Sequence, residues 1–116
     1  MAATLREEDE VAKYLIQGSY TQSGVQGLVK EGGSGRADAV GKLLADLGGS
    51  LEAFYFAFGD DDVYVIADIP DNTTAAALSL AVAAAGAVNI KTTVLLTPEE
   101  MDRATKQSVS YRPPGA

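Results

Sequence analysis

Alternating apolar and polar positions predict four β-strands along the chain. Neighbouring residues of a strand face opposite sides of a sheet. In the second strand, Glu52, Phe54, Phe56 and Phe58 are therefore expected on one face, and Leu51, Ala53, Tyr55 and Ala57 on the other. The second and third strands form a hairpin. The four expected strands are residues 14–20, 51–58, 63–69 and 89–96.

Apolar residues spaced three and four positions apart predict the first helical segment. One apolar run begins after Thr21, a suitable N-cap, and covers residues 25–29. A second apolar stripe covers residues 37–47 and ends at two glycines, a common helix stop. Because three glycines lie between the two runs, we expect one crossover helix that is broken near residues 32–35.

Two further helices are expected in the second half of the chain. Residues 70–73 combine Pro, Asp, Asn and Thr, which predicts the start of an alanine-rich helix that ends at Gly86. The segment Thr97-Pro98-Glu99-Glu100 places a cap, a proline and two acids in the order that begins a helix. The chain then becomes polar and proline-rich, which predicts a flexible C-terminal tail over residues 107–116.

The order of these elements is β-α-β-β-α-β, which predicts an α+β fold of the ferredoxin-like, split β-α-β type. Right-handed crossovers place the helices on one face of a four-stranded antiparallel sheet with strand order 4-1-3-2. We expect a polar N-terminal arm over residues 1–12 and a single domain over residues 13–106. The other face of the sheet is left uncovered.

The apolar residues of the second strand predict self-association. A sheet face that is open to water normally carries polar residues at alternate positions, yet both sides of strand 51–58 are apolar. Exposed apolar patches usually mark interfaces. We therefore expect a homo-oligomer, a dimer or a larger assembly, in which two sheets pack against each other through the open face.

The 116-residue chain contains neither Cys nor His, which excludes disulfides, Cys/His metal sites, histidine-ligated haem and catalysis by thiolate or imidazole. It has 9 basic and 16 acidic residues, a net charge of −7, and no basic patch, so nucleic-acid binding is not expected. The apolar stretches are too short for a membrane span, and the acidic N-terminus does not resemble a signal peptide. We expect a cytoplasmic protein without a cofactor and without membrane contact.

Several short motifs are similar to those of one known family. They are KEGG at 30–33, LEAFYFAFGD at 51–60, DN at 71–72, KTT at 91–93 and LLTPEEM at 95–101. Together they resemble the GYD-domain family of small bacterial proteins, and the resemblance extends from Tyr14 to Ala104. The turn that names the family contains Gly, Tyr and Asp. Gly59 and Asp62 fit this turn, while Asp61 stands in place of the tyrosine.

The resemblance implies a fold of the dimeric α/β-barrel group. This group includes cofactor-free monooxygenases, lactone isomerases, haem enzymes and proteins that only bind a ligand, so the fold does not imply one function. The GYD-domain family has no established reaction. The resemblance therefore assigns no catalytic residue to this chain.

Six side chains within the expected strands are candidates for a ligand site. The tyrosines among them could bracket a flat aromatic or quinone-like ligand, or could pack at an interface. Polar side chains in the interior of a strand must be paired or wet, so the other three could line a cavity between the sheet and the helices. The alternative for Lys91 and Asp68 is a purely structural ion pair. The six candidates are Tyr14, Gln17, Tyr55, Tyr64, Asp68 and Lys91.

Two polar segments outside the strands are further candidates. Gly33, Ser34 and Gly35 at a helix start could hold an anion with backbone N–H groups, with Arg36 adding positive charge; a plain helix break is the alternative. The triplet Asp60-Asp61-Asp62 has the oxygen ligands of a divalent-cation site. Three consecutive residues of a tight turn rarely converge on one ion, so we expect a solvated hairpin tip and no metal site.

These observations leave two main functions open, and an accessory module that assembles with a neighbouring protein is a third possibility. The first is a small homo-oligomeric binding or assembly protein without an assigned reaction. The alternative is a cofactor-free monooxygenase- or isomerase-like enzyme that acts on a small aromatic or lactone-type substrate in a pocket between sheet and helices. Lys91 or Asp68 would then be the acid–base group, and a tyrosine would orient the substrate. A closed pocket of about 300 Å³ or more, lined by these residues, favours the enzyme, and a filled core favours assembly.

Overall fold

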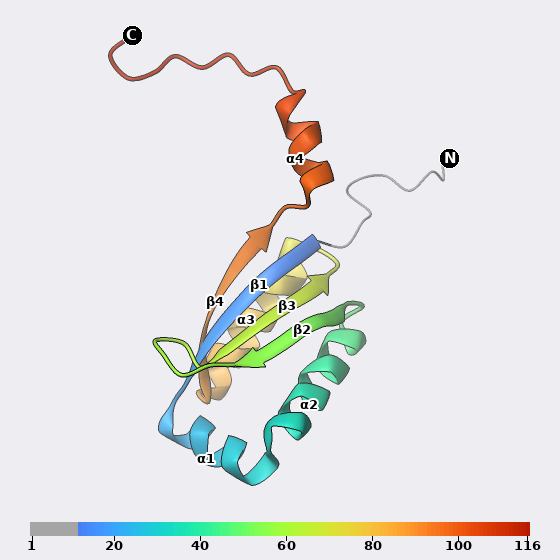
Figure 1. Cartoon of the computed structure of the whole chain (residues 1–116), viewed down its shortest axis with the longest axis vertical. Coiled ribbons are helices and arrows are strands. Elements are labelled where there is room, and N and C mark those ends of the chain that lie inside the picture. The colour runs from blue at the N-terminus through green and yellow to red at the C-terminus, as the bar shows by residue number, and fades with distance from the viewer. Residues whose placement is uncertain (1–11) are drawn as a thin grey trace.

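The computed structural model describes residues 12–116 (Figure 1). The arm expected over residues 1–12 lies outside the described residues except for Ala12, which begins the first strand. None of the helices between residues 12 and 116 has the length and apolar composition of a membrane span. In chain order the elements are β1 (Ala12–Tyr20), α1 (Gln22–Glu31), α2 (Gly33–Asp46), β2 (Ser50–Phe56), β3 (Val63–Ile69), α3 (Asn72–Ala85), β4 (Val88–Leu95) and α4 (Pro98–Thr105).

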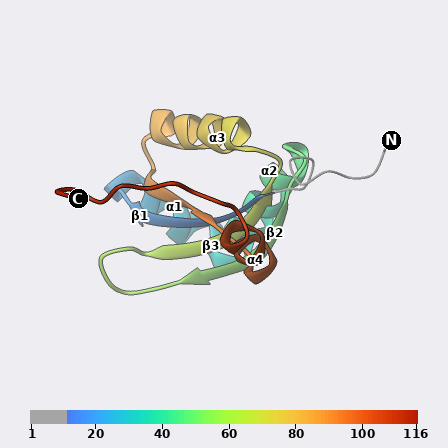
Figure 2. The ribbon, with the colours of Figure 1, turned by 90° about the horizontal axis from the view of Figure 1, so that it is seen from above.

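In the described part of the chain, four strands form one antiparallel sheet in the order β2-β3-β1-β4. This order and the α+β, ferredoxin-like fold confirm the prediction. α3 lies across one face of the sheet (Figure 2), and α2 packs on the same face. Leu44 of α2 and Leu78 of α3 meet Tyr14 and Ile69 of the sheet there and form the core. We call the opposite side of the sheet, which carries Ile66, the open face.

The break in the first crossover helix falls at a single glycine. α1 ends at Glu31, α2 begins at Gly33, and Gly32 between them has a φ of +86°. Glycine reaches this backbone region freely, whereas a side chain there is strained. The chain can therefore turn sharply at Gly32, and the predicted break near residues 32–35 is confirmed.

β2 departs from the expected alternation of its side chains. A β-bulge lies between Leu51 and Ala53. Leu51 pairs with Ala67, and Phe54 pairs with Val65, so Leu51 and Phe54 share the face that the helices cover. The prediction that Leu51 faces away from the phenylalanines is wrong, because the extra residue of the bulge reverses the side on which the preceding residues lie.

β2 also ends earlier than expected. It stops at Phe56, and the side chain of Phe58 is fully exposed in the loop that follows, so the prediction that the strand extends to residue 58 is wrong. The Ala57 N–H donates to the Asp62 carbonyl at 2.8 Å, and the Asp62 N–H donates to the Gly18 carbonyl at 2.7 Å. These bonds turn the loop back onto β1 before Phe58 can pair with β3.

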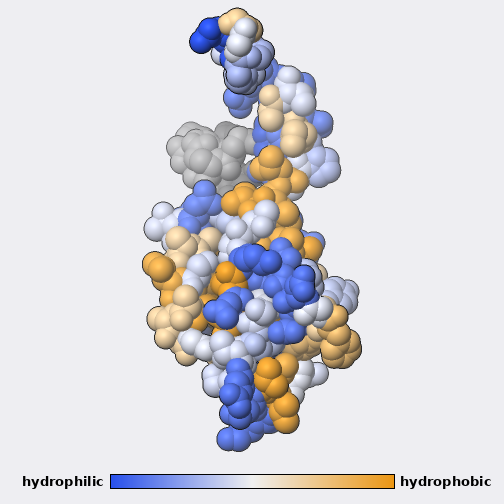
Figure 3. All heavy atoms as spheres, turned by 90° about the vertical axis from the view of Figure 1, so that its left-hand side faces the viewer, coloured by the Kyte–Doolittle hydropathy of each residue, from blue (hydrophilic) through white to orange (hydrophobic). Residues whose placement is uncertain are grey.

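Side-chain caps begin the last two helices, as the sequence predicts. The Asp71 carboxylate accepts a backbone N–H at 2.8 Å at the start of α3, and Gly86 ends this helix in the left-handed conformation. Thr97 and Glu100 form a reciprocal capping box at the start of α4. α4 has no buried residue, and with residues 106–116 it extends beyond β4 as the narrow upper part of the molecule (Figures 1 and 3).

Candidate functional site

Four of the six candidate residues lie side by side on the open face. The strand register pairs Tyr55 with Tyr64, Tyr64 with Gln17, and Gln17 with Lys91. These four residues form one line across the sheet, which we call the tyrosine–lysine row. The Tyr55 side chain is 71% exposed and the Lys91 side chain 68%. The row thus places two aromatic rings, an amide and an ammonium group at the surface of the protein.

A buried carboxylate lies at the lysine end of this row. Asp61 is 7% exposed, and its Oδ2 lies 3.2 Å from Lys91 Nζ and accepts a hydrogen bond from Gln17 Nε2 at 3.1 Å. The prediction of a solvated hairpin tip is wrong for Asp61, because the loop folds back over β1. The expected Lys91–Asp68 pair is also wrong, because strand register places Lys91 beside Gln17 and Asp68 beside Lys13.

Asp68 belongs to a second group of charges at the other end of the open face. Lys13 Nζ lies 2.9 Å from Asp68 Oδ1 and also binds the carboxylate of Glu52. The Ser50 hydroxyl is 3.4 Å from Asp68 Oδ2. We call Lys13, Glu52, Ser50 and Asp68 the Lys13 cluster. The open face therefore carries an ion-paired group at each end.

The middle of the open face is apolar. Ala53, Ile66 and Leu15 lie opposite one another across β2, β3 and β1, between the Lys13 cluster and the tyrosine–lysine row, and the line ends at Thr93 on the edge strand β4. On β2, Ala53 and Tyr55 face this side, while Phe54 faces the helices. β2 is thus apolar on both sides over these positions, as expected.

Tyr14 lies on the other face of the sheet. Its side chain is 1% exposed, and its hydroxyl donates a hydrogen bond to Asn72 Oδ1 at 2.5 Å. Burial raises the pKa of this hydroxyl, and the negative charge of Asp71 adds to the effect. Because the sheet separates Tyr14 from the other five candidates, the six residues do not form a single site.

A cleft of about 340 Å³ lies between α2, α3 and the sheet, and we call it the α2–α3 cleft. Its size falls within the range of about 300–1,000 Å³ that small-molecule sites occupy. Lys91 and Asp68 face the open side instead, so the expectation that they line a cavity between sheet and helices is wrong. The helices contribute Arg36, Val40, Leu43 and Leu44 from α2, and Leu78, Ala81, Val82 and Ala85 from α3.

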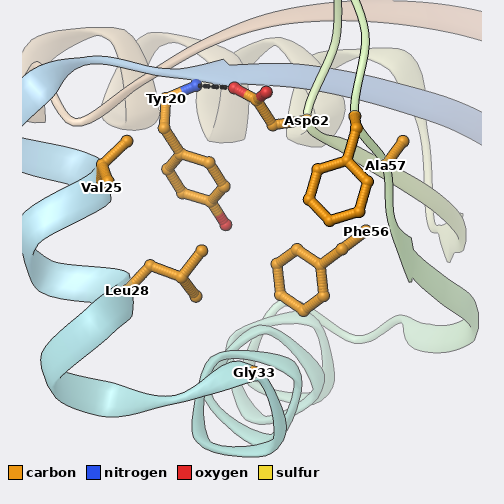
Figure 4. Close-up of a pocket in the computed structure, with 8 residues that line it drawn as sticks. Tyr20, Val25, Leu28, Gly33, Phe56, Ala57 and Asp62 are labelled. Atoms are coloured by element: carbon orange, nitrogen blue, oxygen red, sulfur yellow. Dashed lines mark hydrogen bonds between the residues drawn. The ribbon is translucent and has the colours of Figure 1, made fainter.

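A second hollow, of about 390 Å³, lies beside α1, and we call it the α1 hollow. Val25 of α1 and Phe56 of β2 point into it, around the ring of Tyr20 (Figure 4). Tyr20 lines both hollows, and its backbone N–H donates to the Asp62 carboxylate at 2.8 Å. Burial raises the pKa of the Tyr20 hydroxyl above its ordinary 10.0, and the positive charge of Arg36 acts in the opposite direction.

The four anion-binding candidates Gly33, Ser34, Gly35 and Arg36 form the start of α2, which has no side-chain cap. Arg36 Nη1 lies 3.4 Å from Glu31 Oε1, and Arg36 also lines the α2–α3 cleft. The structure thus brings the four together, and anion binding by them stays a prediction. Across residues 12–116, no three acidic side chains are grouped so that they could hold a metal ion.

The sequence pattern does not predict three members of the ion-paired groups. Lys13 and Asp61 contact the candidates Asp68 and Lys91, and Glu52 contacts Lys13. Lys13 carried a usable signal, because it is four residues before Gln17 in the same strand and therefore shares its face. Glu52 reaches Lys13 from the β2 bulge, which the sequence pattern does not reveal. Asp61 in place of the family's tyrosine is visible in the sequence, but the burial of Asp61 depends on how the loop folds back onto β1.

The stability of the protein is expected to fall at alkaline pH. Burial raises the pKa of Tyr14 above its ordinary 10.0, and hydrogen bonds to Glu52 and then Asp68 raise the pKa of Lys13 above its ordinary 10.5. The unfolded chain therefore loses both protons at a lower pH than the folded chain does. Both contributions are complete below about pH 10 and are lost as the pH rises through the raised pKa values.

Urea unfolding followed by circular dichroism, at pH values from about 8 to about 12, measures this fall. Tyr14→Phe should reduce the loss of free energy of unfolding between the two ends of the range, because the variant has no buried hydroxyl to ionise. Tyr111→Phe is the matched control, since Tyr111 is 72% exposed. An equal loss in the two variants would contradict the assignment to Tyr14.

Comparison with known proteins identifies the family. The GYD domain family matches residues 14–105, a range that runs from β1 to the end of α4. No curated protein and no solved structure matches the chain. The family match covers far more than half of the 116 residues and includes the α1–α2 break, the bulged β2 and the α4 cap described above. The chain belongs to the GYD-domain family.

Proposed function

We propose that this protein is a self-associating binding and assembly module, in which the open face packs against the open face of a second copy. The observation that carries the proposal is the apolar middle of this face, where Leu15 and Ile66 lie between two ion-paired ends. Apolar surface in contact with water is unfavourable. A second copy that covers this surface stabilises both molecules.

The distribution of side chains on the open face supports an interface. Stable interfaces have an apolar centre, enrichment in aromatic residues and a polar rim. Here Tyr55 is 71% exposed and Tyr64 37%, next to the apolar centre. The Lys13 cluster and the Lys91–Asp61 pair lie at the two ends of the face, where their charges would favour one alignment of the two copies over others.

The tyrosine–lysine row supports a second copy as the occupant of this face. The row has the Tyr55 ring on the edge strand β2 and the Lys91 ammonium on the opposite edge strand β4. When two sheets stack about a two-fold axis parallel to the strands, β2 of one copy lies over β4 of the other. Each Lys91 then meets a Tyr55 ring, a favourable cation–π pair. The row is thus complementary to itself.

The positions of the acid–base candidates favour assembly over the cofactor-free enzyme. An acid–base catalyst needs a titratable group that faces the bound substrate. Lys91 and Asp68 face the open side, and each is held in an ion pair. The cleft between sheet and helices has an apolar lining instead, apart from Arg36 and Tyr20. We therefore propose binding and assembly without an assigned reaction.

Light scattering at micromolar concentration tests this proposal. The wild-type protein should have at least twice the chain mass of 12.0 kDa, and Ile66→Glu should have the mass of one chain. The variant places a charge in the apolar centre of both copies, which should weaken association by roughly 100-fold or more. Ile66 is half-buried and lies outside the core cluster, and circular dichroism checks that the variant is folded.

Leu80→Glu is the matched control for this experiment. Leu80 is an apolar residue of α3 with an exposed fraction of 71%, on the other side of the sheet. The control should keep the wild-type mass. A wild-type protein with the mass of a single chain would refute the proposed assembly, and so would loss of association in both variants, because the open face would then not be the specific contact.

A further inference from the structure

The α2–α3 cleft lies on the face of the sheet that the proposed assembly does not use. α2 and α3 both pack on the sheet but hardly touch each other. The side chains of α3 explain this, because Ala81 and Ala85 face the gap and are too small to fill it. Leu43 of α2 also faces the gap and stays 40% exposed. An apolar trough of about 340 Å³ is therefore left open between two helices.

The polar groups of this cleft are few and have one sign of charge. Among residues 12–116, Arg36 and Tyr20 are the lining residues with polar side chains, and no acidic residue of this range lines the cleft. In the described residues, Arg36 makes one ion pair, with Glu31, at a long distance of 3.4 Å. A guanidinium has five N–H donors, so most of those of Arg36 stay available. Arg36 can therefore donate two parallel hydrogen bonds to a ligand carboxylate, the geometry that arginine favours.

The cleft has room for a chain-like ligand. Tyr20 lines both the α2–α3 cleft and the α1 hollow, so the apolar surface continues past its ring. The neighbouring hollow is lined by apolar side chains such as Val25 and Phe56 and by Asp62, whose carboxylate accepts the Tyr20 N–H (Figure 4). A ligand that suits this arrangement has an extended apolar body and a single negative group.

We propose that the α2–α3 cleft binds an apolar monocarboxylate of the fatty-acid type, with the hydrocarbon chain between α2 and α3 and the carboxylate on Arg36. The apolar lining stabilises the chain by removing it from water. Arg36 provides charge complementarity at the mouth of the cleft, in competition with Glu31. This site is separate from the open face, so it does not depend on self-association.

Titration calorimetry of the full chain with octanoate tests the site, with n-octanol as the uncharged comparison. Wild-type protein should bind octanoate saturably and more tightly than n-octanol. Ala81→Phe fills the cleft and should weaken octanoate binding about tenfold or more, and Ala85→Leu should act in the same direction. Ala83→Phe is the matched control on α3, since Ala83 is exposed and does not line the cleft. Circular dichroism confirms that each variant is folded.

Arg36→Gln tests the carboxylate contact. It should lower the affinity for octanoate roughly tenfold and leave n-octanol binding unchanged, because it removes the charged hydrogen bonds alone. The Ile66→Glu variant should still bind octanoate, which separates this inference from the proposed assembly. Absence of saturable binding would overturn the inference, as would wild-type affinity in Ala81→Phe or a preserved preference for octanoate in Arg36→Gln. The inference would also be overturned if the wild-type protein did not bind octanoate and Ala81→Phe changed the mass of the protein. That result would indicate that a second copy occupies the cleft.

Discussion

Gly49→Ala should lower the free energy of unfolding by about 3 kcal/mol or more, which corresponds to a fall in Tm of roughly 10–20 °C for a domain of this size. A Cβ atom at Gly49 would lie 2.1 Å from the Asp68 carbonyl oxygen and 3.4 Å from the Ile69 Cα. These are backbone atoms of β3, an interior strand that pairs with both β1 and β2. The clash cannot be relieved by rotating a side chain, so the backbone at Gly49 must move away from β3.

Gly41→Ala is the matched control for this substitution. Its Cβ would lie 3.8 Å from Leu51 Cδ2, an ordinary contact, in the interior of α2. Alanine favours the helix there and should raise the free energy of unfolding by about 0.5–1 kcal/mol. Thermal unfolding followed by circular dichroism measures both variants. A Gly49→Ala protein as stable as the wild type would show that the approach of Gly49 to β3 is not this close.

Leu44→Ala should lower the free energy of unfolding by about 3–5 kcal/mol. Leu44 is 1% exposed and is the buried residue of α2, where it packs into the core cluster with residues such as Tyr14 and Ile69. Its removal leaves a cavity between α2 and the sheet. Since α2 and α3 hardly touch, α3 cannot compensate for the lost contact.

Leu43→Ala is the control for Leu44→Ala, since it makes the same chemical change one residue earlier. Leu43 is 40% exposed at the mouth of the α2–α3 cleft, so its replacement should cost about 1 kcal/mol. Urea unfolding gives both free energies, and the slope with urea concentration should stay the same for the two variants. Equal losses in the two variants would show that Leu44 does not anchor α2.

The starts and the break of the helices could be predicted because their signals are local. Gly32 breaks the first helical segment, Asp71 begins α3, and Thr97 begins α4, in each case through groups within about four residues. The same holds for strand order, which follows from the sequence of elements and the handedness of their connections. The predictions failed where two segments that are distant in the sequence meet in the structure. The bulge at Leu51 changed the faces of β2, and the loop folded back onto β1 at Asp61.

The candidate site was predicted in part for the same reason. Alternation along β1 and β4 placed Gln17 and Lys91 on faces that the structure brings together, and Tyr64 joined them through the β3 register. Tyr14 was assigned to the same group. It lies three residues before Gln17 in β1, so its side chain is on the opposite face of the sheet and packs in the core. The predicted ion pair between Lys91 and Asp68 was wrong. The two residues are 23 positions apart in the chain, and each meets a different partner across the sheet.

The amino-acid sequence was sufficient for the α+β order of elements, the family, the open face and the exclusion of Cys- and His-based chemistry. These properties depend on short-range patterns and on which residue types are present. The partners of Lys13 and Lys91, the burial of Asp61 and the α2–α3 cleft required the folded chain. A shift of one residue in strand register moves a side chain to the opposite face, and a cleft depends on how far two helices stand apart, so neither follows from local patterns.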